Sequence, residues 1–215
     1  MLLFRQIKQV LKNKGGLFMG NNYIITIGRE YGSGGFEIGK KLAEKLGIAF
    51  YDKNLIDEVA KKSGIHIDML HKGDEKSISS WLNPVYQNGT LNDRIFWAQS
   101  DVIRDIAERE SCVIIGRCAD YILKDLDNVV NVFVQAPFED RVKRICNKYL
   151  IELRDEAVRE IRKTDKQRRS YYEFYTDYGW GDRRHKDLVV NSSVLGIDGT
   201  VDFIKNFVEC KFNLE

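Results

Sequence analysis

Short, unbroken runs of apolar residues alternate along this chain with longer segments in which apolar residues recur every three or four positions. Unbroken runs are typical of strands buried on both faces of a parallel sheet, and the longer period is typical of helices that pack along one face. Their alternation predicts a parallel sheet with helices on both sides. The strands are expected at Tyr23 to Ile27, Ile48 to Tyr51, Cys112 to Ile115, Val129 to Val134 and Leu188 to Val190.

The helical segments follow these runs, and some carry boundary signals. Pro137 stands where a helix is expected to begin, the position that tolerates proline best. Residues 65–90 interrupt the alternation because they are polar and irregular and contain turn signals, which indicates an inserted segment. Helices are expected after the first glycine cluster, after Pro137, and over about 54–62, 91–109, 151–178 and 201–210.

Glycines crowd the connection between the first predicted strand and its helix, at positions 28, 32, 34 and 35. A glycine-rich turn lets successive backbone N–H groups face a bound anion, and the helix N-terminus adds the positive end of its dipole. Close packing alone would explain one or two glycines, but three within four residues favour phosphate binding. We therefore predict a phosphate cradle formed by Gly32, Ser33, Gly34 and Gly35.

This loop departs from the common phosphate-loop pattern G-x-x-x-x-G-K-S/T. Gly35 follows Gly34 where the lysine would stand, and Phe36 takes the place of the hydroxyl residue that helps to hold Mg²⁺. The positive charge that the lysine supplies is therefore missing from the loop. Arg29, which directly follows Gly28, is the best candidate to replace it.

Polar residues also follow the other predicted strands. Asp52 and Lys53 follow the second, Arg117 and Asp120 the third, and Gln135 the fourth. Open parallel sheets bind their ligands at the carboxyl ends of the strands, so these side chains are expected at one crevice. Arg117 comes directly after a buried strand, which favours a contact with a ligand over a surface ion pair.

A second group of basic residues lies in the later helices. Arg141 and Arg144 follow Pro137, and Arg168 and Arg169 fall within a tyrosine-rich stretch. Arginines on a closing flap would neutralise charge on a transferred phosphoryl group. The alternative is a solvated helix face with ion pairs between successive turns, and the pattern of Arg168 and Arg169 fits both interpretations.

Composition and charge exclude several classes of protein. A chain of 215 residues with 43% apolar residues suits one compact α/β domain, and a net charge of +2 is too small for a general nucleic-acid or membrane binder. The four cysteines and three histidines have no metal-ligand spacing, which predicts reduced thiols in a cytoplasmic protein and no metal held by protein alone. No apolar run is long enough to span a bilayer.

The first 18 residues have a pattern of their own, with apolar positions at helical spacing among basic residues. They lack the apolar block of a secretory signal and would form a surface amphipathic helix. An alternative hypothesis starts from Lys14, Gly15 and Gly16, whose codons would resemble a bacterial ribosome-binding site just before Met19. On that hypothesis Met19 is the true start and the leader is not part of the native protein.

Three blocks of the sequence resemble the bacterial cytidylate kinase-like family, relatives of the nucleoside monophosphate kinases: ITIGREYGSGGFEIGKKLAEKLGIAFYDKNLIDEVAKKSG, VIIGRCADYIL and DKQRRSYYEFYTDYGWGDRRHKDLVVNSSVLG. The resemblance implies a P-loop NTPase three-layer fold over residues 19–215, with a five-stranded parallel sheet and helices on both faces. It also implies a monophosphate-binding segment at about 63–90 and a helical lid at about 151–186.

The resemblance extends to individual residues. Gly32, Ser33 and Gly34 match the family's phosphate loop, and Gly35 and Glu37 stand where true cytidylate kinases have lysine and threonine. Asp52 matches an acid at the start of the monophosphate segment, whereas Lys53 and Glu58 replace a serine and an arginine, and Cys118 replaces an acid. Gly116 and Arg117 match a pair whose arginine contacts the acceptor, and Arg168 and Arg169 fall in the lid.

These matches imply a kinase that transfers the γ-phosphoryl group of ATP, bound with Mg²⁺, to a nucleoside monophosphate such as CMP or dCMP. The expected roles are catalysis for Arg29, Arg168 and Arg169, phosphate binding for the loop residues and Arg141, and acceptor binding for Asp52, Lys53 and Arg117. Two alternatives stay open: a non-catalytic nucleotide-binding module, and a kinase for a non-nucleotide small molecule.

Overall fold

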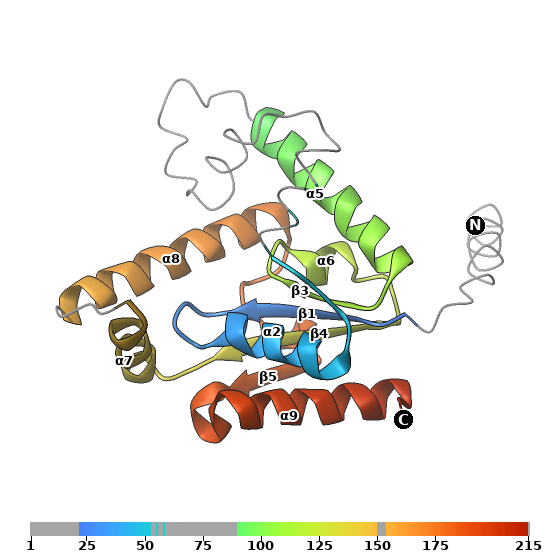
Figure 1. Ribbon diagram of the computed structural model, residues 1–215. Coiled ribbons are helices and arrows are strands. Elements are labelled where there is room, and N and C mark those ends of the chain that lie inside the picture. Colours follow the sequence, from blue (N-terminus) through green and yellow to red (C-terminus); the bar gives the residue numbers. More distant parts are fainter. Residues whose placement is uncertain (1–21, 53–54, 56–57, 59–89, 150–153, 215) are drawn as a thin grey trace, which may run out of the picture.

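The computed structural model describes residues 22–52, 55, 58, 90–149 and 154–214 (Figure 1). The predicted leader, Lys53, and nearly all of the predicted monophosphate-binding segment lie outside the described residues. The described part forms one sheet with helices packed against it.

Five strands form a single parallel sheet in the order β2-β3-β1-β4-β5. The central strand, β1 (Ile24–Arg29), pairs with β3 (Cys112–Ile115) on one side and β4 (Val129–Gln135) on the other. The edges are β2 (Ala49–Tyr51) and β5 (Leu188–Asn191). The predicted strands are thus confirmed, and β1 extends two residues further because Gly28 and Arg29 still pair with β4.

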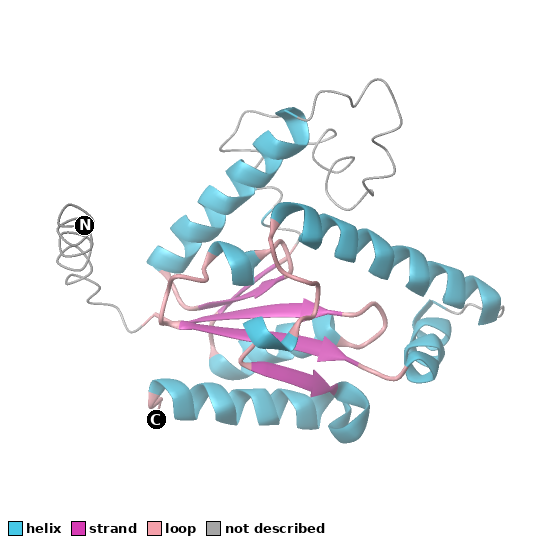
Figure 2. Ribbon diagram, turned by 180° about the vertical axis from the view of Figure 1, so that it is seen from behind, coloured by secondary structure: helices cyan, strands magenta, loops and turns pink. Residues whose placement is uncertain are grey.

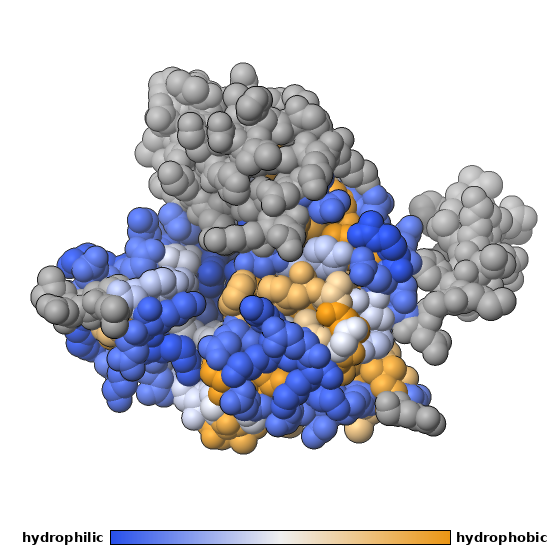
Figure 3. Space-filling view, in the orientation of Figure 1, coloured by the Kyte–Doolittle hydropathy of each residue, from blue (hydrophilic) through white to orange (hydrophobic). Residues whose placement is uncertain are grey.

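Helices cover both faces of the sheet. On one face, α2 (Gly35–Leu46) and α9 (Ser192–Phe212) pack on a core that contains the odd-numbered residues Ile25 and Ile27 of β1. On the other, α5 (Thr90–Arg109) and α6 (Ala119–Ile122) border a second core. Figures 1 and 2 show α7 (Phe138–Tyr149) and α8 (Arg154–Tyr175) at the end toward which the strand arrows point. Hydrophilic residues cover the outward faces of α2, α7 and α8 in Figure 3.

Both ends of α8 are attached to the rest of the molecule. Near its start, Ala157 and Ile161 pack with α7 in a small apolar cluster. Near its end, the ring of Tyr175 stacks on Phe96 of α5, with 4.2 Å between the ring centroids and 9° between the planes. Between these contacts the helix lies at the carboxyl ends of the strands (Figures 1 and 2), within the segment for which the family resemblance implies a lid.

Helix α9 begins nine residues before the helix that the sequence predicted over 201–210. Asn191 caps its first turn by accepting a hydrogen bond from the backbone N–H of Ser193, 3.0 Å away. Gly196 then adopts a φ of 68° and kinks the helix. That kink breaks the apolar periodicity, which is why sequence pattern alone located only the second part.

Candidate functional site

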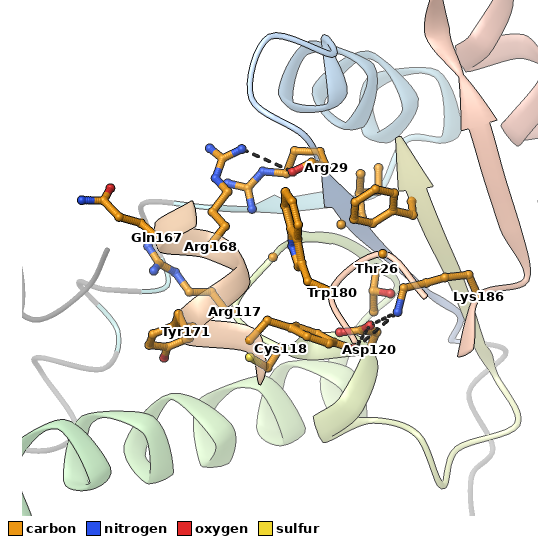
Figure 4. Close-up of a pocket in the computed structure, with 16 residues that line it drawn as sticks. Thr26, Arg29, Arg117, Cys118, Asp120, Gln167, Arg168, Tyr171, Trp180 and Lys186 are labelled. Atoms are coloured by element: carbon orange, nitrogen blue, oxygen red, sulfur yellow. Dashed lines mark hydrogen bonds and ion pairs between the residues drawn. The ribbon is translucent and has the colours of Figure 1, made fainter. Parts of the chain in front are cut away.

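A pocket lies at the carboxyl ends of β1, β3 and β4 and beneath α8 (Figure 4). Residues from β1, the turn after β3, α8 and the segment before β5 line it together. This is where an open parallel sheet is expected to bind a ligand.

The glycine loop runs from the end of β1 to the start of α2. Gly32 and Gly34 both have a φ of 82°, a left-handed conformation that glycine adopts without strain. Gly34 is the N-cap of α2 and provides no side-chain hydrogen bond to the helix end. The first-turn N–H groups of a helix lack intrahelical partners, so this end of α2 suits an anion.

Ser33 supports the loop from inside. It is buried, and its hydroxyl donates a hydrogen bond to the carbonyl oxygen of Glu30 at 2.8 Å. Its own carbonyl oxygen accepts a hydrogen bond of 2.5 Å from the buried hydroxyl of Ser192. Its backbone N–H donates to the same Glu30 carbonyl oxygen at 3.2 Å. Ser33 therefore shapes the loop, and this geometry favours a supporting role over the predicted phosphate contact.

Arg29 occupies a slot between two glycines. A Cβ atom on Gly35 would lie 2.5 Å from the Cβ of Arg29, and one on Gly116 would lie 2.3 Å from its Nη1. Any side chain at position 35 would therefore displace the stem of Arg29. The loop has no room for a lysine at position 35 while Arg29 holds this place in the pocket wall.

The turn after β3 has an uncommon backbone. Gly116, Arg117 and Cys118 have φ values of 71°, 56° and 55°, so two residues other than glycine are left-handed. Such conformations cost about 1–3 kcal/mol each and persist where the surrounding structure holds them, often at functional sites. This turn brings Arg117 into the pocket wall. Cys118 lines it too, and burial raises the pKa of its thiol.

Arg141 lies beneath the loop with two carboxylates. Its Nη1 is 2.5 Å from Oδ2 of Asp165, and its Nε is 3.5 Å from Oε2 of Glu30. Asp165 also accepts a hydrogen bond of 2.7 Å from the backbone N–H of Tyr31. Arg141 is 8% exposed and does not line the pocket, so this geometry favours a supporting role over the predicted phosphate contact.

Arg144, one turn further along α7, reaches the loop instead. Its Nη1 donates a hydrogen bond of 2.6 Å to the carbonyl oxygen of Gly32, and its Cζ would be 3.7 Å from a Cβ on Gly34. In the sequence Arg144 fell in the same basic group as Arg141 and had no predicted role of its own. The helical spacing of three residues was the only signal, and it does not show which arginine faces the loop.

The predicted pair Arg168 and Arg169 is split by α8. Arg168 lines the pocket, donates a 3.4 Å hydrogen bond to the carbonyl oxygen of Arg29, and has a buried Nε with no hydrogen-bond partner among the described residues. Arg169 is exposed, and its Cζ lies 5.7 Å from the centroid of the Trp180 ring. Only Arg168 therefore joins Arg29 and Arg117 at the pocket.

Asp52 follows the end of β2 and is not among the pocket-lining residues that the structure describes, and Lys53 lies outside the described residues. Two residues that sequence reasoning left without a role, Tyr172 and Lys186, line the pocket with Asp120. Lys186 and Asp120 form an ion pair at its far end. Lys186 gave no pattern in the sequence, because it is one of several basic residues in a polar connection.

The described residues do not form a protein-only metal site, since no group of three or more His, Cys, Asp or Glu side chains meets among them. The hydroxyl of Ser33 is already hydrogen-bonded, and Phe36 is 43% exposed at the position where a hydroxyl would assist Mg²⁺. Mg²⁺ fits this site only as part of a nucleotide complex, held mainly by phosphates and water. Among the same residues, no helix combines the length and apolar character that crossing a membrane requires.

Comparisons of the sequence with known proteins identify a family and relatives for this chain. A family model described as the cytidylate kinase-like family matches residues 24–194. A cytidylate kinase from Methanococcus aeolicus is 24% identical over 191 residues, which cover 87% of this chain and 98% of that protein.

Solved structures extend the comparison. An uncharacterized protein from Eubacterium ventriosum is 32% identical, with a TM-score of 0.69 over 87% of this chain and 99% of that one. Shikimate kinase from Bacteroides thetaiotaomicron shares 15% identity, with a TM-score of 0.51 over 87% of this chain and 98% of that one. At that identity the likeness concerns the fold alone, which is the P-loop kinase arrangement of a parallel sheet and surrounding helices.

Proposed function

Because the chain belongs to the cytidylate kinase-like family, we propose that it transfers the γ-phosphoryl group of ATP to a nucleoside monophosphate, with CMP or dCMP as the preferred acceptor. The observation that carries this proposal is the meeting of Arg29, Arg117 and Arg168 in one pocket beside the glycine loop (Figure 4). Phosphoryl transfer needs little covalent help from a protein, and positioned positive charge is its main requirement.

Arg29 takes the part of the missing lysine in this proposal. Its guanidinium lies against Gly116 and its stem against Gly35, so it is fixed between the loop and the turn that carries Arg117. A fixed positive charge near the β- and γ-phosphates stabilises the transition state without reorganising. The N–H groups at the start of α2 would hold the phosphates themselves.

The donor base would rest on the outer side of the loop. Arg144 and Ile197 both lie against Gly34, and Val194 and Leu195, in the first turn of α9, are 74% and 53% exposed. A guanidinium plane and an apolar surface suit the two faces of a purine ring. This arrangement gives a reason for the exposed apolar side chains at the start of α9.

The acceptor would occupy the pocket beneath α8. Arg117 would bind its phosphate. Asp52 and Lys53, which follow β2 in the sequence, are proposed to contact other parts of the acceptor. An oxygen of that phosphate would bond to the γ-phosphorus as the bond from this phosphorus to the β,γ-bridging oxygen of ATP breaks, and that oxygen leaves with ADP. Arg29 and Arg168 would neutralise the charge on the transferring group, and Mg²⁺ bound to ATP would neutralise charge on the donor phosphates.

The proposal is tested by measuring ADP release with Mg·ATP in the presence of CMP, dCMP, UMP or AMP. We expect turnover that depends on one monophosphate and falls at least about a hundredfold in Arg117→Ala. Arg159→Ala, an exposed position on α8, is the matched control and should retain full activity.

Two other outcomes point elsewhere. Stabilisation by ATP without turnover would favour a non-catalytic nucleotide-binding module or an acceptor of another chemical class. Turnover that survives in Arg117→Ala would contradict the assignment of the acceptor site.

A further inference from the structure

The end of the pocket farther from the phosphate loop is built around a buried ion pair. The side chain of Lys186 is 2% exposed and that of Asp120 is 15% exposed. Lys186 Nζ contacts Oδ2 of Asp120, and the hydroxyl of Tyr172 donates a hydrogen bond of 2.8 Å to the same oxygen. Two donors from different segments therefore fix the orientation of one carboxylate.

This arrangement leaves the other carboxylate oxygen for a ligand. Both hydrogen bonds of the Asp120 side chain converge on Oδ2, and Oδ1 accepts none from the residues that the structure describes. Asp120 lines the pocket. The pocket therefore presents one oriented hydrogen-bond acceptor at this end. The Lys186 ammonium is already engaged by Asp120, by the Tyr172 hydroxyl and by the carbonyl oxygen of His185.

Aromatic rings form a wall between this acceptor and the arginines. Phe133 and Trp180 meet edge to face, with 5.4 Å between their centroids. Cβ atoms on Gly28 and Gly181 would lie 2.8 and 2.9 Å from the Phe133 ring, so both glycines are needed for the ring to sit there. Figure 4 shows Trp180 between Arg29 and Arg168 on one side and the Asp120–Lys186 pair on the other.

We propose that Asp120 selects the acceptor by accepting a hydrogen bond from the exocyclic amine of its base, so that cytosine is preferred to uracil. The inference rests on the proposed function and adds the residue that reads the base. Cytosine carries an amine at its C4 position, which a carboxylate accepts well, whereas uracil presents a carbonyl oxygen there that a carboxylate repels. The anionic end of the nucleotide would face the arginines, and its planar base would lie along the aromatic wall.

The test is Asp120→Asn, because the two donors on Oδ2 dictate how the new amide must turn. Its carbonyl oxygen would face Lys186 and Tyr172, so its NH₂ group would face the pocket. Binding of CMP and UMP is measured by calorimetry without ATP. We expect CMP to bind roughly tenfold more weakly and UMP to bind more tightly than in the unchanged protein, so that the preference reverses.

A second variant controls for loss of folding, because Asp120→Asn alone leaves the buried Lys186 ammonium without its counter-charge. The second variant removes that ammonium as well. In Asp120→Asn with Lys186→Met, Tyr172 alone still orients the amide, and the same reversal is expected. Asp125→Asn, an exposed acid after α6, is the control that should leave both affinities unchanged.

The outcomes separate this inference from the proposed function. Turnover of nucleoside monophosphates with an unchanged ratio of CMP to UMP affinity in both variants would overturn the role of Asp120 and leave the kinase intact. Absence of binding by either nucleotide to the unchanged protein would overturn both.

Discussion

The guanidinium groups around the pocket differ in what surrounds them, and this difference decides what each can do. Arg141 faces two carboxylates beneath the loop, whereas Arg144 reaches the loop surface at Gly32. Arg29 is confined between Gly35 and Gly116. Arg141 is therefore placed to hold the loop, whereas Arg29 lies in the pocket wall, where a substrate can reach it.

Replacing Arg29 by alanine should lower kcat by about a hundredfold or more while changing the affinity for ATP by only a few fold, because its charge acts mainly on the transition state.

Gly35→Lys alone should also lose activity, since the new side chain displaces Arg29. The double variant Arg29→Gly with Gly35→Lys should recover part of the activity that Gly35→Lys loses, because glycine at position 29 removes the Cβ atom that a side chain at position 35 would meet. Steady-state ADP release and ATP titration measure the activity and ATP affinity of all three variants. A double variant no more active than Gly35→Lys would show that the side chains at positions 29 and 35 do not compete for one place.

Arg144→Ala should raise the KM for ATP by about tenfold and leave the KM for the acceptor unchanged, since Arg144 lies on the donor side of the loop. Lys148→Ala changes an exposed basic residue one turn further along α7 and should alter neither constant. Initial rates with each substrate varied in turn separate the two effects. Equal increases in the KM for ATP and the KM for the acceptor would contradict a role for Arg144 on the donor side alone.

Part of this site could be predicted from residue order alone. Arg29 is the last residue of β1 and Arg117 comes two residues after β3, and a strand end leaves little freedom in where a side chain lies. The difference between Arg141 and Arg144 depends on how α7 is rotated against the loop, which the sequence does not encode locally. The pairing of Asp120 with Lys186 joins residues 66 positions apart, so no local pattern marks it.

At the scale of elements, α8 and the phosphate loop form one connected unit. Asp165 of α8 accepts hydrogen bonds from Tyr31 of the loop and from Arg141 of α7. The same helix brings Arg168 to the pocket and ends against Phe96 of α5. Asp165 therefore links α8 directly to the loop and to α7.

Asp165→Asn should lower the free energy of unfolding by about 3 kcal/mol, because removing one partner leaves Arg141 with its charge partly uncompensated in a mostly buried setting. Chemical denaturation followed by circular dichroism gives this value. Asp155→Asn removes an exposed acid from the first turn of the same helix and should cost little. Equal stabilities of the two variants would show that the Arg141 network contributes nothing to folding.

The elements themselves were largely predictable. Unbroken apolar runs located every strand to within two residues, because a strand buried on both faces tolerates few polar positions. Helix ends were harder: α8 ends at Tyr175 and not near 178, and the first turn of α9 depends on the cap at Asn191. Caps and kinks are set by one or two residues, and a periodic pattern averages over them.

For the whole molecule, ionisable groups in the apolar interior set a limit on stability at high pH. Burial raises the pKa of the Cys112 thiol from 9.0 to about 12 and that of the Tyr175 hydroxyl from 10.0 to about 12. Burial also raises the pKa of Tyr172, which donates to Asp120. The fold thus favours the protonated form of each group.

Stability should consequently change little between pH 7 and about pH 9 and fall as the pH rises toward 12, because the unfolded chain loses these protons first. Thermal unfolding midpoints measured at intervals from pH 7 to about pH 11 test this. The decline should begin near the ordinary pKa of a cysteine thiol. A midpoint that does not change up to pH 11 would contradict it.

The slot that holds Arg29 also constrains how this loop could have evolved. A single mutation that restored lysine at position 35 would collide with Arg29, and a single mutation that removed Arg29 would leave the loop with neither charge. The two arrangements are therefore separated by an intermediate of low fitness. Lineages with one arrangement should pass to the other only through paired substitutions, and natural relatives should carry a long side chain at one of the two positions and glycine at the other.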